Sequence, residues 1–254
     1  MSMAPVGSWS LCVDELVGHG AALGVQTWPA VLDLPVSAVV ESDRHATDHD
    51  TPDVPEPCEP ALAELLARLD RPELCFVIRV AVADPIRACA VVTGEASSLA
   101  VREGRTVRLQ QLPAGIDAVA GAVVGLLGDT VAADLRPVRA PIADLAARLA
   151  AAELADDYVD ALYACGVPGR DAVMLGSAMG ACSGHTEIVV VRTVDGSTTV
   201  SPAAVVVLET PAGRVIAGPS LSPDRVLWTT FATGTRQRLR QALASLIETL
   251  DDDP

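Results

Sequence analysis

The 254-residue sequence contains no lysine, so all 18 of its basic residues are arginines. Without lysine the chain can form neither a Schiff base nor a Walker A phosphate loop. Acidic residues number 33, and the formal net charge is −15. A surface of this sign repels phosphate backbones and anionic lipid headgroups, so we expect neither nucleic acid nor a membrane as a partner.

Long hydrophobic segments are also missing. The longest apolar run, residues 118–127, lies between Asp117 and Asp129 and is too short to cross a bilayer. The first seven residues contain no basic residue and no continuous apolar stretch. We therefore expect no signal peptide and a cytoplasmic location.

Aromatic residues are scarce, at 3%, whereas half of the chain is hydrophobic. The core must therefore consist mainly of alanine, valine and leucine, and the chain is long enough to bury a sizeable one. The cysteines contain no CxxC pair, so we expect reduced, mostly buried thiols. These cysteines are Cys12, Cys58, Cys75, Cys89, Cys165 and Cys182.

The first 60 residues predict two elements and a loop. Hydrophobic periodicity favours a helix over 11–23 and a strand over 28–34. Residues 41–60 are dense in Asp, Glu, His and Pro, a composition that cannot form a packed element. We expect a mobile acidic loop there.

From residue 60 onward, the order helix, four strands, helix occurs twice. Short turns between the strands favour antiparallel pairing. The first copy has a helix at 60–70, strands at 74–82, 87–93, 99–103 and 106–112, and a helix at 116–127. The second has a helix at 171–179, strands at 187–193, 199–208, 214–217 and 226–231, and a helix at 236–250. Between them, 134–164 predicts a short extended piece and two helices.

The closing helices of the two copies carry apolar residues at identical spacing, as expected for helices packed on a sheet. These residues are Ile116, Val119, Ala120, Val123, Val124 and Leu127 in the first, and Leu239, Ala242, Leu243, Leu246, Ile247 and Leu250 in the second. We therefore predict an α+β fold, a single domain over 1–254. Its quasi-twofold related halves, 1–133 and 134–254, should form a central sheet with helices packed on one side.

One short pattern is similar to a dinucleotide-binding fingerprint. Gly18-His19-Gly20 is followed by Gly24, but the last glycine is one residue too far away. The segment before it is also predicted as a helix rather than a strand. A helix that ends in glycine explains the pattern better.

A second pattern, Gly180-Ala181-Cys182-Ser183-Gly184, has cysteine at the nucleophile position of a GxSxG elbow, and His185 follows. An elbow needs a strand before it and a helix after it, whereas this stretch is predicted to run from helix to strand. We therefore expect a turn here. A cysteine-dependent hydrolase that uses Cys182 and His185 remains the least favoured function.

A third group is rich in residues that could bind a metal. His45 and His49 lie among Asp43, Asp48 and Asp50. A solvated loop does not hold ligands in the fixed geometry that tight binding requires. We expect no metal, no cofactor and no catalytic residue in the chain, and therefore no enzymatic activity.

Several segments of the second half resemble the ESX secretion-associated EspG family. They are Leu162-Tyr163-Ala164-Cys165-Gly166-Val167-Pro168, Glu209-Thr210-Pro211-Ala212-Gly213-Arg214-Val215 and Trp228-Thr229-Thr230. Their order and spacing match the family, and weaker likeness extends to residues 28–32, 74–82 and 99–127. The acidic stretch 41–60 departs from the family, which often has a helical segment there.

This resemblance implies a cytosolic chaperone that binds the PPE tip of PE–PPE heterodimers, keeps them soluble and directs them to a type VII (ESX) secretion system. It also implies a contact surface on the central sheet and the C-terminal helices. We expect a monomer or weak homodimer. The alternative function is a ligand-sensing regulatory domain that uses the same face of the sheet.

Polar residues on the strands and last helix of the second half are the candidates for contact with this partner. They are Glu187, Arg192, Thr199, Ser201, Glu209, Arg236 and Arg240. Each is also compatible with an ordinary solvent-facing position. Polar strand residues of this kind fix the register of a partner whose apolar tip is buried.

Overall fold

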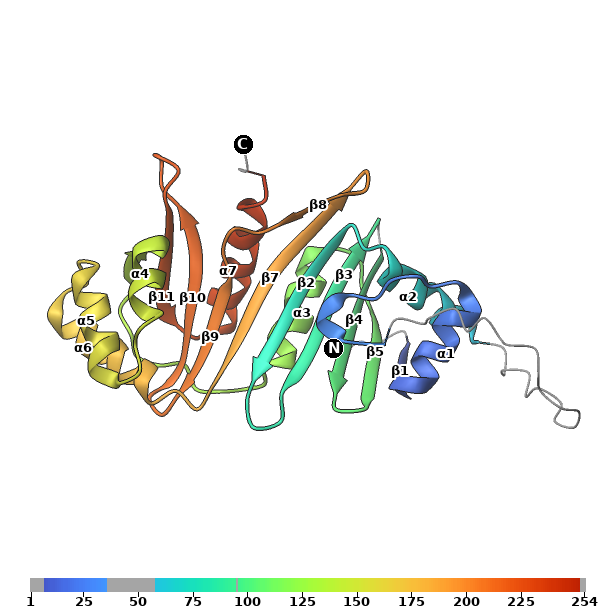
Figure 1. Cartoon of the computed structure of the whole chain (residues 1–254), viewed down its shortest axis with the longest axis horizontal. Helices are drawn as coiled ribbons and strands as arrows, with labels where there is room; N and C mark the ends of the chain where they lie inside the picture. The colour runs from blue at the N-terminus through green and yellow to red at the C-terminus, as the bar shows by residue number, and fades with distance from the viewer. Residues whose placement is uncertain (1–6, 36–57, 95, 252–254) are drawn as a thin grey trace, which may run out of the picture.

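The computed structural model describes residues 7–35, 58–94 and 96–251, and its strands form one antiparallel sheet (Figure 1). The order of the strands is β1-β5-β4-β3-β2-β7-β9-β10-β11-β6, and β8 pairs only with β7. The two ends of this order belong to different halves of the chain. Strands β2 and β7 meet in the middle, where Ile78 pairs with Ile188.

The strands are bounded as follows: β1 Ser8–Cys12, β2 Leu74–Ala81, β3 Ile86–Thr93, β4 Ala96–Glu103, β5 Thr106–Leu112, β6 Val138–Pro141, β7 Gly184–Val194, β8 Ser197–Val200, β9 Val205–Thr210, β10 Gly213–Leu221 and β11 Leu227–Thr233. The helices are α1 Val13–Leu23, α2 Pro60–Asp70, α3 Ile116–Leu126, α4 Ile142–Leu149, α5 Ala155–Ala164, α6 Gly169–Gly180 and α7 Arg236–Glu248, with a short 3₁₀ helix, η1, at Ala30–Leu32.

The order of the sheet is symmetric about the junction of β2 and β7. Strands β2, β3, β4 and β5 followed by α3 correspond to β7, β9, β10 and β11 followed by α7. Outside them, β1 borders β5 as β6 borders β11. The predicted quasi-twofold α+β fold is therefore confirmed, whereas the exact boundary at 133/134 stays a prediction.

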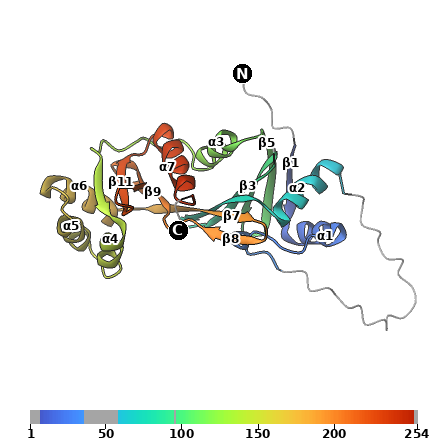
Figure 2. The same ribbon diagram turned by 90° about the horizontal axis from the view of Figure 1, so that it is seen from above.

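Helices α3 and α7 cover one side of the sheet, which we call the first face (Figure 2). Alternate side chains of the central strands point there, among them Phe76, Ile78, Ile188 and Val190, all fully buried. The stripes predicted on the closing helices meet these residues in one continuous core. Burial of this apolar surface is the main stabilising contribution of the helices.

The opposite side, the second face, carries the other helices at its two ends. Helices α1, η1 and α2 pack over β3, β4 and β5, whereas α4, α5 and α6 pack over β10 and β11. The prediction that helices pack on one side holds for α3 and α7 only. The outer strands bury side chains on both faces, as Leu99 and Ala100 on β4 illustrate, and therefore need cover on both.

Three local predictions differ from the structure. Residues 28–34 contain η1 rather than a strand, because Pro29 opens the turn and Asp33 closes it in the left-handed region, with φ of 49°. The strand predicted at 199–208 is interrupted at Pro202, which has no backbone N–H for the ladder, so β8 and β9 pair with different parts of β7. Strand β1 was not predicted; it forms because β5 supplies its hydrogen-bonding partners.

Helix α1 ends as the glycine pattern predicts, because Gly24 caps it in the left-handed conformation. Gly20 has a second role, since a Cβ atom there would lie 2.4 Å from Cζ2 of Trp28. The glycine therefore lets the Trp28 ring lie against the helix. Of the acidic loop predicted at 41–60, residues 41–57 lie outside the described residues. At its end, Glu59 accepts a hydrogen bond from the Trp9 indole at 2.9 Å.

Candidate functional site

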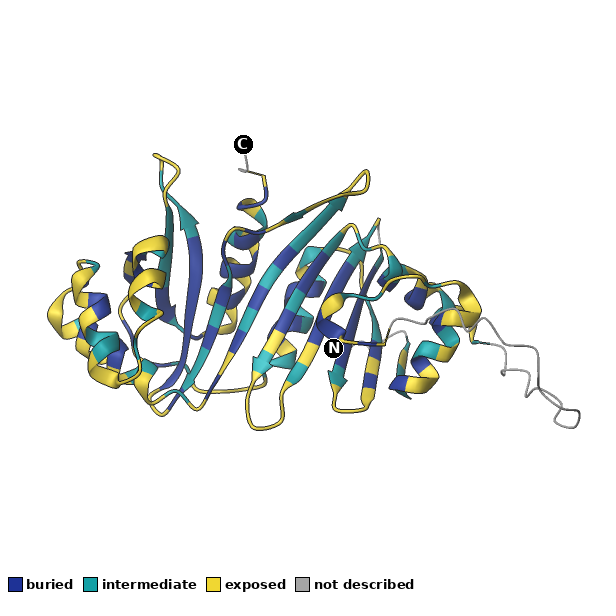
Figure 3. Cartoon of the chain, in the orientation of Figure 1, coloured by how far each residue is buried: buried dark blue, intermediate teal, exposed yellow. Residues whose placement is uncertain are grey.

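In the part of the chain that the structure describes, the two helical groups of the second face leave the middle of the sheet without an α-helix over it (Figures 1 and 3). The residues of β2, β7 and β9 that point to this opening form the central strip. They are Val77, Arg79, His185, Glu187, Val189 and Val206. All six are half-buried or exposed, although they occupy the centre of a wide sheet.

Register places the strip residues side by side. Val77 pairs with Val189, and Glu187 lies between Arg79 on β2 and Val206 on β9. The strip thus presents one ion pair surrounded by valines. A partner's apolar side chains can cover such a surface while the charged pair fixes the orientation.

A row of arginines leads to this ion pair across three neighbouring strands. Arg102 on β4 lies opposite Arg87 on β3, which lies opposite Arg79 on β2. Like charges directly opposite each other are destabilising. Each of the three arginines therefore has its own partner for its positive charge.

The compensation is complete at the covered end of the row and weakest at the centre. Arg102 donates to the carbonyl oxygens of Leu32, at 2.6 Å, and Gly104, at 2.9 Å. Arg87 pairs with Asp33 beside η1. Among the described residues, Arg79 pairs with Glu187 alone, at 3.5 Å, and the two side chains remain 60% and 44% exposed. An exposed pair of this length contributes little to stability, so a partner's carboxylate can replace Glu187 at small cost.

The helices at one end of the second face add exposed apolar side chains. Leu154 before α5 and Tyr163 within it are 69% and 66% exposed, and Val173 and Met174 on α6 are also exposed. Aromatic and methionine side chains are enriched where proteins bind each other. The α5–α6 pair is therefore a second component of the candidate surface.

Of the residues predicted to contact a partner, Glu187 lies in the central strip. Arg192 and Thr199 are paired across β7 and β8, but Arg192 points to the first face, where it forms an ion pair with Asp251. Ser201 is buried, and its hydroxyl donates to Ala203 O and accepts from Val190 N. This hydroxyl holds the turn before β9.

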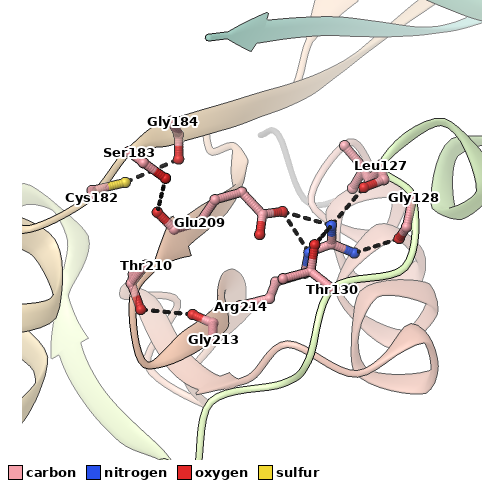
Figure 4. Close-up of polar contacts among 10 residues, drawn as sticks. All are labelled: Leu127, Gly128, Thr130, Cys182, Ser183, Gly184, Glu209, Thr210, Gly213 and Arg214. Carbon is pink, nitrogen blue, oxygen red and sulfur yellow. Dashed lines mark hydrogen bonds and ion pairs between the residues drawn. The ribbon is translucent and has the colours of Figure 1, made fainter.

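Glu209 takes part in a partly buried network around the Arg214 side chain (Figure 4). Its carboxylate accepts from Arg214 at 2.6 Å, and Arg214 also donates to the carbonyl oxygens of Leu127 and Gly128 and to the Thr130 hydroxyl. This network fixes the segment that follows α3 against β9 and β10. The charge of Glu209 is therefore used inside the fold.

The predicted helix residues lie on the first face. Arg236 forms an ion pair with Asp129, and Arg240 points from α7 towards Gly121 of α3. The structure does not bring the predicted residues into one site. Sequence reasoning missed Arg79, although the alternation of Cys75, Val77 and Arg79 with Phe76, Ile78 and Val80 places it on the less buried side of β2.

The cysteine pattern forms a turn from α6 to β7, as expected, and not an elbow. The Cys182 thiol lies 3.0 Å from the carbonyl oxygen of Gly184, and no hydrogen bond joins it to His185 within the described residues. All six cysteines are free, but only Cys75 and Cys89 are buried, fewer than predicted. A hydrogen bond with Cys75 and burial raise the pKa of Cys89 well above its ordinary value, so its thiol is neutral.

Two further sequence predictions concern metals and membranes. The histidine and aspartate group at 43–50 lies outside the described residues. Among the residues that the structure describes, no three His, Cys, Asp or Glu side chains gather as a metal site would require. No helix in the described ranges has the length and apolar character needed to span a bilayer.

Comparison with known proteins identifies relatives across most of the chain. The chain is 28% identical over 200 residues to the ESX-1 secretion-associated protein EspG1 of Mycobacterium tuberculosis (strain ATCC 25618 / H37Rv), covering 76% of this chain and 66% of that protein, just under two thirds. It is 30% identical over 198 residues to EspG1 of Mycolicibacterium smegmatis (strain ATCC 700084 / mc(2)155), covering 77% and 67%.

A solved structure matches the whole fold. It is the Mycobacterium tuberculosis type VII secretion system chaperone EspG5 in complex with the PE25–PPE41 dimer, with a TM-score of 0.77, 13% identity and coverage of 98% of both chains. At 13% sequence identity, this match shows that the two chains share a fold. The family model described as the EspG family matches residues 13–245, and the chain therefore belongs to the EspG family.

Proposed function

We propose that this protein is a chaperone that binds a PE–PPE heterodimer through the PPE protein, keeps the dimer soluble and directs it to a type VII secretion system. Membership of the EspG family and the fold shared with EspG5, which was solved bound to PE25–PPE41, support the proposal. The observation that carries it is the central strip. Antiparallel sheets often leave one face to solvent, but here half-buried valines surround the Arg79–Glu187 pair on that face, which suits an apolar partner.

The strip and the α5–α6 pair together form the contact surface in this proposal. Val77, Val189 and Val206 contact the apolar tip of the PPE protein, and Arg79 pairs with an acidic residue on it. Glu187 competes for Arg79 and so favours partners that supply a carboxylate in the right place. The protein acts by binding alone, as a cytoplasmic monomer or weak homodimer, and performs no catalysis.

Co-expression tests the proposal directly. The full chain is produced with each PE–PPE pair encoded in the same genome, and the products are separated by gel filtration. We expect at least one pair to elute with the chain as a single complex. If every pair elutes separately, the proposal is wrong, and thermal shift assays with small metabolites would then test the regulatory alternative.

A further inference from the structure

The first face, opposite the central strip, has a groove that the proposed function does not use. The groove lies beside α3 and has a volume of about 580 Å³. Its floor is formed by Leu99 and Val101 of β4, and its wall by Ala122, Gly125 and Leu126 of α3. Arg108 lies at the rim, where it forms an ion pair with Glu103 at 2.6 Å. An apolar floor with a polar rim is typical of a binding groove.

The repeated fold produces an equivalent groove beside α7. In the larger groove, Leu99 of β4 is paired with Gln110 of β5. At the equivalent position of the second groove, Ile216 of β10 is paired with Ala232 of β11. This second groove has only about 240 Å³, because Arg238 and Gln241 of α7 line it. At α3 two of the three wall residues, Ala122 and Gly125, are small, so the groove is wider there.

Three arginines lie near the start of α7, the helix that packs against α3. Arg236, Arg238 and Arg240 lie in the first turns of α7 and are exposed, and the first turn has no acidic residue. Cations at a helix N-terminus oppose the macrodipole, so this arrangement reduces the stability of α7. In a chain with a net charge of −15, such a cluster indicates a surface selected for binding.

The arginines differ in how far they are compensated. Arg236 pairs with Asp129, and Arg238 donates to Gln241 at 3.3 Å. Arg240 makes no hydrogen bond or ion pair within the described part of the chain. Its Nη2 atom lies 3.7 Å from where a Cβ on Gly121 would be, and Gly121 is about one helical turn before Gly125 in the groove wall. An uncompensated guanidinium therefore lies over α3 beside the groove.

We propose that this groove and Arg240 form a second docking surface, which binds an acidic amphipathic helix of a protein other than the PE–PPE cargo. Apolar side chains of the partner helix occupy the groove between α3 and β4–β5, and one of its carboxylates pairs with Arg240. Gly125 and Ala122 allow the partner backbone to approach closely. Because the groove and the central strip lie on opposite faces, cargo and this partner can bind at the same time.

Two synthetic peptides of about 18 residues test the proposal, a length near the minimum for a helix in water. Both carry the same leucine stripe at helical spacing; one has glutamate at its polar positions and the other has lysine. Binding to the full chain, without any PE–PPE dimer, is measured by fluorescence anisotropy at about 0.15 M salt, where charges act over about 8 Å. We expect the glutamate peptide to bind at least about tenfold more tightly than the lysine peptide. The net charge of the chain, −15, would by itself favour the lysine peptide.

Substitutions locate the binding. Gly125→Trp fills the groove, and Arg240→Glu reverses the free charge; each should weaken binding of the glutamate peptide at least about tenfold. Both variants should fold, because a Cβ on Gly125 meets nothing within 4 Å and a glutamate near a helix N-terminus favours the macrodipole. Circular dichroism spectra of the two variants, compared with that of the wild type, show whether they fold.

The matched controls are Gly18→Trp, also at an open helical glycine, and Arg105→Glu, also at an exposed arginine. Both should bind the glutamate peptide within about twofold of the wild type. The proposal is wrong if the glutamate peptide does not bind, if the lysine peptide binds as tightly, or if Gly125→Trp and Arg240→Glu bind like their controls.

Discussion

At the scale of single residues, the arginines of this chain divide into two groups by how their charge is used. Arg214 and Arg102 donate to backbone carbonyl oxygens and hold distant segments together. Arg79 and Arg240 retain most of their capacity for hydrogen bonds and lie on opposite faces of the sheet. The first group stabilises the fold, and the second is available to partners.

Arg214 provides the sharpest test of the first group. Its side chain is 4% exposed and its donors meet Glu209, Leu127, Gly128 and Thr130. Because Arg214→Ala leaves a partly buried carboxylate and two carbonyl oxygens without a donor, we expect the free energy of unfolding to fall by about 2–4 kcal/mol. Urea denaturation followed by circular dichroism measures the change.

The control for this variant is Arg71→Ala, whose side chain is 77% exposed and pairs with Asp70 at 3.5 Å. A change within about 0.5 kcal/mol is expected there, as for ordinary surface substitutions. A loss below about 1 kcal/mol for Arg214→Ala would contradict the role assigned to the network, since one ordinary hydrogen bond contributes that much.

At the scale of elements, the sequence predicted most of the strands and the two closing helices because their periodicity is strong. The Leu62, Leu65 and Leu66 face of α2 and the alternation in β5 are examples. The predictions were wrong where tertiary contacts, rather than local periodicity, determine the secondary structure. Residues 28–34 are apolar enough for a strand, but they pack as η1 over β2 and β3, and β1 forms only because β5 is there.

Two glycines in α1 test how such contacts override local propensity. Gly18→Ala should raise the free energy of unfolding by about 0.5–1 kcal/mol, because alanine favours the helix and its Cβ meets nothing within 4 Å. Gly20→Ala should lower it by about 1–3 kcal/mol, because its Cβ would overlap the Trp28 ring. Thermal unfolding of both variants measures the difference. Stabilisation by both would show that Trp28 does not pack against α1 as described.

At the scale of the whole molecule, the repeat explains why a binding surface lies at the centre. Each half covers its own outer strands on the second face, and the junction of β2 and β7 is covered by neither. The duplication of the fold could be predicted from the sequence. The pairing of Arg79 with Glu187 was not, because it depends on the register between strands from different halves.

The affinity of the chain for a PE–PPE dimer selected by the co-expression experiment tests the central claim most directly. Isothermal titration calorimetry compares Arg79→Glu, in the central strip, with Arg105→Glu, at another exposed and ion-paired arginine that lies outside it. We predict that Arg79→Glu raises Kd at least about tenfold, about 1.4 kcal/mol, while Arg105→Glu stays within about twofold of the wild type. An unchanged Kd for Arg79→Glu would show that the cargo binds elsewhere.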